Sequence, residues 1–138
     1  MSDFPERIVH VDDQSTIRMG VKMAIEEHSP EGYIVNCSSG KELLDRIKEI
    51  HPDLILLDLM MPDMDGPDVL EALRKDSFSK GIPVIFLTGN EKIVMHNTFD
   101  TLGVIGVIQK SSGAEDMIVQ ISKIWATYIS DEDTEELS

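Results

Sequence analysis

The most informative segment of this 138-residue chain is Asp53-Leu54-Ile55-Leu56-Leu57-Asp58-Leu59-Met60-Met61-Pro62-Asp63-Met64-Asp65-Gly66. It begins with a short apolar run that predicts a buried β-strand, and Asp58 closes that run. The residues after Asp58 are largely polar and favour turns. The strand therefore delivers one carboxylate to the carboxyl edge of a sheet, which is where open α/β sheets bind ligands.

Three other apolar runs also end in residues that carry chemistry. These residues are Asp12 and Asp13 after residues 8–11, Thr88 after residues 84–87, and Lys110 after residues 107–109. Because parallel strands end at a common edge, we expect three carboxylates, a hydroxyl and an ammonium to meet there. This combination indicates a metal-assisted phosphoryl site.

Strand-like and helix-like segments alternate along the chain. The predicted strands are about 7–11, 33–37, 53–58, 82–88 and 105–109. The predicted helices run from Ser15 to about His28, from Ser39 to His51-Pro52, from near Pro67, and over about 91–102 and 114–129. We expect Ser15 to cap the first helix, and Ser39 precedes the second. Five β-α repeats with right-handed crossovers predict an α/β fold, a doubly wound, flavodoxin-like parallel sheet of strand order 2-1-3-4-5.

The composition favours one soluble domain. Hydrophobic residues make up 41% of the chain, which is too many for a disordered protein. No apolar run approaches the roughly 20 residues of a membrane span, and the N-terminus lacks the basic start and apolar core of a signal peptide. The single Cys37 excludes an internal disulfide and fits a reducing compartment, so we expect a cytoplasmic protein.

The chain is strongly acidic, with a net charge of −14. Such a charge repels nucleic acid and anionic lipid, so we expect no direct binding of nucleic acid or membranes. Five of the acids lie in the last eight residues. We expect residues 6–129 to form the domain and residues 130–138 to be either a disordered acidic tail or the start of a linker into a further domain.

Crowded carboxylates repel one another, and a hard divalent cation relieves that repulsion. Mg²⁺, or Mn²⁺ in its place, takes oxygen ligands and is held by one or two carboxylates together with waters. We expect Asp13 and Asp58 to bind the metal directly and Asp12 to act through water. The backbone carbonyl of Met60 is a further expected ligand, because the loop turns there.

Asp58 is also the expected nucleophile, which forms an aspartyl phosphate when it attacks a phosphoryl group. Lys110 is the natural counter-ion for a phosphoryl oxygen, and Thr88 offers a hydroxyl donor to another. Taken singly, each residue has a simpler explanation: a turn or helix-cap aspartate, a strand threonine, a solvated lysine. Their joint placement at four strand ends favours the phosphoryl site.

Over essentially its whole length, about residues 6–129, the chain resembles the receiver domain of two-component response regulators. The matching motifs are Val11-Asp12-Asp13, Leu57-Asp58-Leu59-Met60-Met61-Pro62-Asp63-Met64-Asp65-Gly66, Leu87-Thr88-Gly89 and Lys110. The resemblance implies that Asp58 is the phosphoacceptor, that Asp12 and Asp13 form the acidic metal pocket, that Thr88 is the switch hydroxyl and that Lys110 contacts the phosphoryl group.

The resemblance also implies partners. The donor would be a phosphohistidine on a histidine kinase or a histidine phosphotransfer protein. A downstream protein would bind the surface of helix 4, strand 5 and helix 5. Such a domain is not a turnover enzyme and catalyses only its own Mg²⁺-dependent phosphorylation and autodephosphorylation. We expect a monomer or weak dimer.

Two positions depart from the pattern of the family. Many receivers carry an aromatic residue three positions before the lysine, where this chain has Val107, and a proline after the lysine, where it has Ser111. Without proline a cis peptide costs about 2.5–4 kcal/mol, so we expect a trans bond or a remodelled loop. Both departures affect the output face and leave the phosphorylation pocket intact.

Three alternatives remain at this point. The chain can be a stand-alone receiver, or a receiver excised from a larger multidomain regulator. It can also be a non-phosphorylated interaction module that keeps the pocket as a relic. A related phosphatase is disfavoured, because such hydrolases place a second aspartate two residues after the nucleophile, where this chain has Met60.

Overall fold

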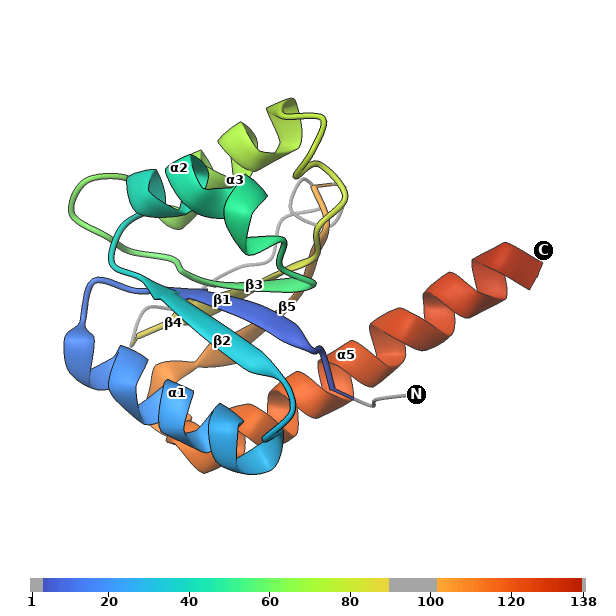
Figure 1. Cartoon of the computed structure of the whole chain (residues 1–138), viewed down its shortest axis with the longest axis horizontal. Coiled ribbons are helices and arrows are strands. Elements are labelled where there is room, and N and C mark those ends of the chain that lie inside the picture. Colours follow the sequence, from blue (N-terminus) through green and yellow to red (C-terminus); the bar gives the residue numbers. More distant parts are fainter. Residues whose placement is uncertain (1–3, 90–101, 138) are drawn as a thin grey trace.

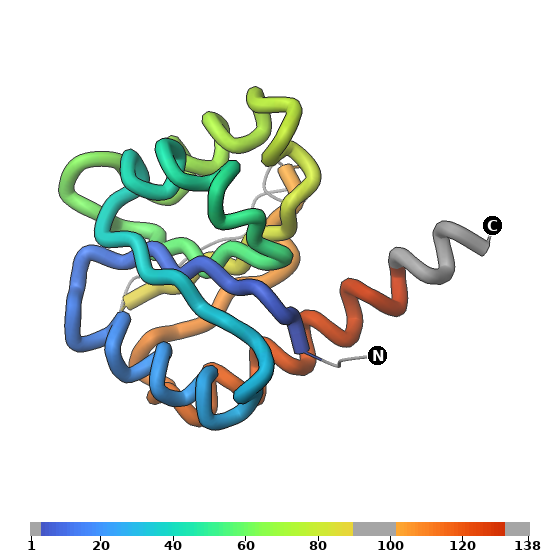
Figure 2. Tube along the Cα trace, viewed as in Figure 1, coloured from blue at the N-terminus to red at the C-terminus, as the bar shows by residue number. Residues whose placement is uncertain are grey.

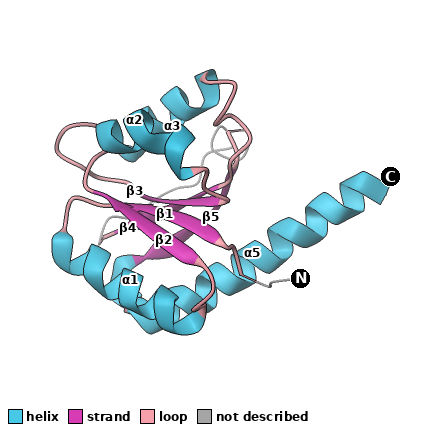
Figure 3. Cartoon of the chain, viewed as in Figure 1, coloured by secondary structure: helices cyan, strands magenta, loops and turns pink. Residues whose placement is uncertain are grey.

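A computed structural model describes residues 4–89 and 102–137 of the chain. Five strands form one parallel sheet (Figure 3). They are β1 (Arg7–Val11), β2 (Tyr33–Cys37), β3 (Leu54–Asp58), β4 (Val84–Thr88) and β5 (Val104–Gln109). Their order is β2-β1-β3-β4-β5, which confirms the doubly wound topology that the alternating pattern predicted.

Helices cover both faces of the sheet. They are α1 (Ser15–His28), α2 (Gly40–Ile50), α3 (Gly66–Lys75) and α5 (Ala114–Leu137), with a short 3₁₀ turn, η1 (Lys110–Ser112). Helices α1 and α5 lie on one face, and α2 and α3 lie on the other (Figure 1). The helix predicted at about 91–102 lies almost entirely outside the described residues.

Strand β3 is the centre of the packing. Leu54 and Leu56 belong to the apolar core beneath α1 and α5, whereas Ile55 and Leu57 belong to the core beneath α2 and α3. Successive side chains of a strand point to opposite faces, so a strand covered on both sides is apolar at every position. This two-sided burial explains the unbroken apolar run before Asp58.

Of the first two helices, only α2 has a serine cap. Ser39 caps α2, since its hydroxyl accepts a hydrogen bond from the backbone N–H of Glu42 at 3.1 Å. The prediction for Ser15 was wrong, because Ser15 is the first helical residue of α1 and Gln14 occupies the cap position. The backbone N–H of Gln14 donates to Asp12 Oδ1 at 2.8 Å, so a turn at Asp12 starts the helix instead.

Helix α5 is longer than predicted. It runs to Leu137 instead of ending near residue 129. The part of the helix that is drawn in red in Figure 2 extends beyond the sheet. The segment after residue 129 contains no glycine or proline to stop the helix. The division into a domain over 6–129 and a terminal segment over 130–138 stays a prediction.

Within residues 4–89 and 102–137, no helix has both the length and the apolar character required to cross a membrane.

Burial of β3 on both faces can be tested by truncation. Ile55→Ala should lower the free energy of unfolding by about 2–5 kcal/mol, because it leaves a cavity in a fully buried position. Met19→Ala is the control, since Met19 is 64% exposed, and should change it by less than about 0.5 kcal/mol. Urea denaturation followed by circular dichroism measures both, and equal losses would contradict the packing described.

Candidate functional site

The strand ends bring the predicted site residues to one edge of the sheet. Asp12 and Asp13 follow β1, Asp58 ends β3, and Lys110 follows β5. Carboxylate oxygens of Asp12, Asp13 and Asp58 all lie within 4.8 Å of one another. Asp12 and Asp58 are buried while Asp13 is exposed, so the cluster has one side open to solvent.

Lys110 binds two of these carboxylates. Its Nζ lies 2.7 Å from Asp12 Oδ2 and 3.0 Å from Asp58 Oδ2. Burial lowers the pKa of Lys110, but the hydrogen bonds to both carboxylates and their negative charges together outweigh burial, and the net pKa is raised. The ammonium is therefore held charged, already beside the oxygen atoms at which a phosphoryl group would arrive.

One ammonium does not neutralise three carboxylates. Burial raises the pKa of Asp58 from 3.8 to about 6; Lys110 opposes this rise, and the neighbouring Asp12 carboxylate adds to it. The ionised carboxylate of Asp58 is therefore less stable in this site than in water unless a further positive charge is close to it. This excess of negative charge, on hard oxygen donors with one open side, fits a divalent cation such as Mg²⁺.

Thr88 lies at the end of β4, one residue beyond the strand partner of Asp58. Its hydroxyl is buried, and Oγ1 has no hydrogen-bond partner within the described part of the chain. A buried hydroxyl usually has a hydrogen-bond partner, so among the described residues Thr88 Oγ1 keeps a donor that the strand ends do not use.

A cleft of about 460 Å³ opens over the acidic cluster. Its lining includes Asp13, Gln14, Asp58, Met60, Met61, Pro62, Gly89 and Lys110. The backbone N–H of Met60 donates to Asp58 Oδ1 at 3.3 Å, which orients the carboxylate, and the Met60 side chain is exposed at the rim. The Met60 carbonyl as a metal ligand stays a prediction.

Gly66 explains why the motif after Asp58 ends in glycine. A Cβ on Gly66 would lie 2.9 Å from the backbone oxygen of Asp58. The backbone N–H of Gly66 also donates to Leu59 O at 2.9 Å, so the loop folds back tightly against the end of β3. Any larger residue would push the loop away from the carboxylate.

Two further residues, Arg18 and His10, lie beside the acidic cluster, and sequence reasoning did not identify Arg18. The Arg18 guanidinium, on α1, donates a short hydrogen bond to the backbone oxygen of Asp12. His10 is fully buried, with Nε2 3.8 Å from Asp12 Oδ2, and burial lowers its pKa to about 4. His10 is therefore neutral at pH 7. No spacing in the sequence identifies Arg18, because its contact depends on how α1 leaves β1.

The Lys110–Ser111 bond is trans, since no cis peptide occurs among the described residues. Lys110 instead begins the 3₁₀ turn η1, and Gly113 follows it with φ of 86°. A positive φ favours glycine, so Gly113 suits the backbone at the end of this turn. Val107 is partly buried and packs on the core beneath α2 and α3.

Comparison with known proteins identifies the family of this chain. Residues 8–122 match the response regulator receiver domain family. The chain belongs to this family.

Two relatives illustrate the similarity. Response regulator protein VraR of Staphylococcus saprophyticus is 33% identical over 122 residues, which cover 88% of this chain and 57% of VraR. DNA-binding response regulator MtrA of Mycobacterium tuberculosis is 32% identical over 120 residues, 87% of this chain and 46% of MtrA. The chain thus spans about half the length of these relatives.

Solved structures agree on the fold. A CheY-like response regulator receiver domain protein from Methanospirillum hungatei JF-1 superposes with a TM-score of 0.74 at 28% identity, over 88% of this chain and 94% of that one. NtrX from Brucella abortus superposes with a TM-score of 0.81 at 20% identity, over 98% of this chain and 30% of NtrX. The second similarity supports the fold alone.

The raised pKa of Asp58 has a consequence for stability. The folded state holds the Asp58 proton more tightly than the unfolded state, so its favourable contribution is present at low pH and is lost as pH rises from about 4 through about 6. At pH 7 the ionised carboxylate costs about 3 kcal/mol. Asp58→Asn should therefore raise the free energy of unfolding by up to about 3 kcal/mol at pH 7 without metal, measured by urea denaturation.

The control for that prediction is the same pair of proteins at pH 4, where their difference should nearly vanish. Added Mg²⁺ should stabilise the wild type more than Asp58→Asn, because a ligand stabilises the state that binds it. An equal or lower stability of Asp58→Asn at pH 7 would show that Asp58 carries no electrostatic strain.

Proposed function

We propose that this receiver domain accepts a phosphoryl group on Asp58 from a phosphohistidine of a histidine kinase or a histidine phosphotransfer protein. The observation that carries the proposal is the pairing of Lys110 with both Asp12 and Asp58, in a cluster that keeps excess negative charge. A simple turn or helix-cap aspartate would have neither an ammonium paired with it nor two acidic neighbours. The same geometry disfavours a module that has lost phosphorylation.

In the proposed reaction a carboxylate oxygen of Asp58 attacks phosphorus. The oxygen–phosphorus bond forms as the phosphorus–nitrogen bond of the donor breaks, and the donor imidazole takes the electron pair. Asp13, Asp58 and, through water, Asp12 would hold Mg²⁺ or Mn²⁺, which supplies charge neutralisation at the transferring phosphoryl group. Lys110 neutralises another phosphoryl oxygen, and the Met60 N–H holds Asp58 in place.

Thr88 would couple phosphorylation of Asp58 to a structural change. Its hydroxyl, which has no hydrogen-bond partner among residues 4–89 and 102–137, can donate to a phosphoryl oxygen and so draw the end of β4 toward Asp58. The side chain at Val107 has no ring to rotate, so the change would reach the surface around β5 and α5 through backbone shifts and aliphatic repacking. A downstream protein would bind this surface. The helix predicted at about 91–102, which lies almost entirely outside the described residues, would form part of the same surface.

This chain would act by binding another protein. MtrA is described as DNA-binding, and the chain spans about half its length, so a second candidate role is the receiver part of a longer regulator of that kind. In either case the net charge of −14 disfavours DNA contact by these residues themselves.

Burial raises the pKa of the Cys37 thiol to about 11, so it stays an unreactive thiol, which fits a cytoplasmic protein.

Phosphorylation is tested directly with a small donor. Incubation of the full chain with Mg²⁺ and acetyl phosphate should add one phosphoryl group, detected by intact mass. Asp58→Asn should abolish the adduct, whereas Asp63→Asn, an exposed aspartate on the following loop, should keep it. An unmodified wild type, or an undiminished adduct on Asp58→Asn, would refute the proposal.

The metal assignment is tested by a second variant. Asp13→Ala should weaken Mg²⁺ binding at least ~10-fold, because it removes a carboxylate from the open side of the cluster. It should leave the domain folded and slow phosphorylation by acetyl phosphate. Calorimetric titration with Mg²⁺ measures the affinity, with Asp63→Ala as the matched control, and unchanged affinity in Asp13→Ala would remove Asp13 from the metal ligands.

A further inference from the structure

His10 is a polar residue in a place where the sheet otherwise carries apolar ones. It is the fourth residue of β1 and is fully buried. Its partner on β3 is Leu56, which belongs to the core beneath α1 and α5, so the imidazole lies on that face of the sheet. Neither Nδ1 nor Nε2 has a hydrogen-bond partner among residues 4–89 and 102–137. Buried polar side chains without partners are uncommon, so this one requires an explanation.

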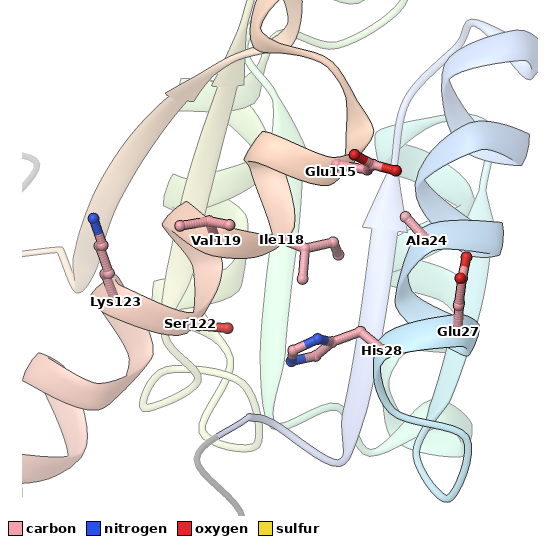
Figure 4. A pocket seen from close by; sticks show the side chains of 8 residues that line it. All are labelled: Ala24, Glu27, His28, Glu115, Ile118, Val119, Ser122 and Lys123. Carbon is pink, nitrogen blue, oxygen red and sulfur yellow. The ribbon is translucent and has the colours of Figure 1, made fainter.

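The imidazole of His10 is closed off from solvent. A groove of about 550 Å³ lies between α1 and α5, and Figure 4 shows the side chains that line it. His10 is not one of them, and it does not line the cleft over Asp58 either. A protein group beside the imidazole is therefore its natural partner.

The group beside the imidazole is the carboxylate of Asp12. His10 Nε2 lies 3.8 Å from Asp12 Oδ2, just beyond the 2.7–3.2 Å or so of a hydrogen bond. Because burial lowers the pKa of His10 to about 4, the imidazole is neutral at pH 7 and carries one N–H. A proton on Nε2 is attracted to the carboxylate, whereas a lone pair there would be repelled. The carboxylate therefore selects the Nε2–H tautomer.

Lys110 occupies the oxygen that faces His10. Its Nζ lies 2.7 Å from Asp12 Oδ2, and the same ammonium lies 3.0 Å from Asp58 Oδ2. The other oxygen of Asp12, Oδ1, accepts from the backbone N–H of Gln14. Both oxygens of this buried carboxylate therefore have partners, but the partner of Oδ2 is shared with Asp58.

Phosphorylation of Asp58 changes the demand on Lys110. In the proposed reaction this ammonium neutralises a phosphoryl oxygen, which draws it away from Asp12. The carboxylate of Asp12 is fully buried, so the loss of its ionic partner carries a free-energy cost. His10 is placed to supply the missing donor, because a movement of about 1 Å turns the 3.8 Å separation into a hydrogen bond.

We propose that His10 is a positioning residue of the phosphoryl site, whose Nε2–H donates to Asp12 Oδ2 when Lys110 shifts to the phosphoryl group. The hydrogen bond keeps the Asp12 carboxylate in place beside the metal and Asp58. This role depends on the proposed phosphorylation of Asp58. A neutral donor suits the position, because a second cation there would compete with the divalent ion for the acidic cluster.

Two replacements of His10 in the full chain test this role. His10→Gln keeps an N–H donor, whereas His10→Leu fills the same apolar face without one. With Mg²⁺ and acetyl phosphate at pH 7, His10→Leu should form the Asp58 adduct about 10-fold or more slowly, as is usual when a group that supports a metal ligand is lost. His10→Gln should stay within about threefold of the wild type. Ile8→Val is the packing control on the same strand and in the same core, and it should also stay within about threefold.

The imidazole gives a second readout in the wild-type chain labelled with ¹⁵N-histidine. His10 should be the Nε2–H tautomer, and its Nε2-bound proton should move to lower field when Asp58 is phosphorylated, because the hydrogen bond to Asp12 then forms. The signal is assigned by its loss in His10→Gln. A histidine that only packs would give the same signal before and after phosphorylation.

Several results would overturn the role of His10: an unchanged rate in His10→Leu, equal slowing by His10→Leu and His10→Gln, or an Nε2–H signal that phosphorylation leaves unmoved. Urea denaturation should show His10→Leu to be no less stable than the wild type, because it removes a buried polar group without a partner. The tautomer measurement uses the wild type and so decides even if that variant unfolds. A wild type that takes no phosphoryl group would instead refute the proposed function, so the two failures are distinguishable.

Discussion

The excess of negative charge at one sheet edge is the constraint on which the rest of the molecule depends. Parallel strands end together, so the residues that follow β1 and β3 place three carboxylates within 4.8 Å. Lys110, brought in after β5, neutralises only part of that charge. Burial of Asp58 therefore carries a free-energy cost that a cation or a bound phosphoryl group with its metal can relieve. The rigid sheet, apolar on both faces, is what keeps these groups together despite their repulsion.

Most of the fold follows from local patterns in the sequence. Short runs that are apolar at every position predict strands covered on both faces, and their alternation with amphipathic helices predicts the strand order. The same argument predicts that Asp12, Asp58 and Lys110 meet, because topology alone places strand ends at a common edge. Ser39 was placed directly before the second helix, and its hydroxyl caps that helix through a contact within one helical turn.

What sequence reasoning missed depends on contacts between distant segments or on competing local turns. The bond from Arg18 to the Asp12 backbone reflects the angle at which α1 leaves β1, and the close approach of Gly66 to Asp58 reflects how the loop folds back. Ser15 is not the cap residue, because the turn at Asp12 starts α1 one residue earlier than predicted. The length of α5 was underestimated because acidic residues near a helix C-terminus are unfavourable but do not stop the helix.

The central claim is that Asp58 is buried among more negative charge than Lys110 can neutralise. The most direct measurement is a pH titration of the Asp58 carboxyl by ¹³C NMR on the metal-free chain, repeated with saturating Mg²⁺. The structure predicts a pKa of about 6 without metal and a clearly lower one with Mg²⁺. A metal-free pKa near 3.8 that Mg²⁺ does not change would contradict this account of the site.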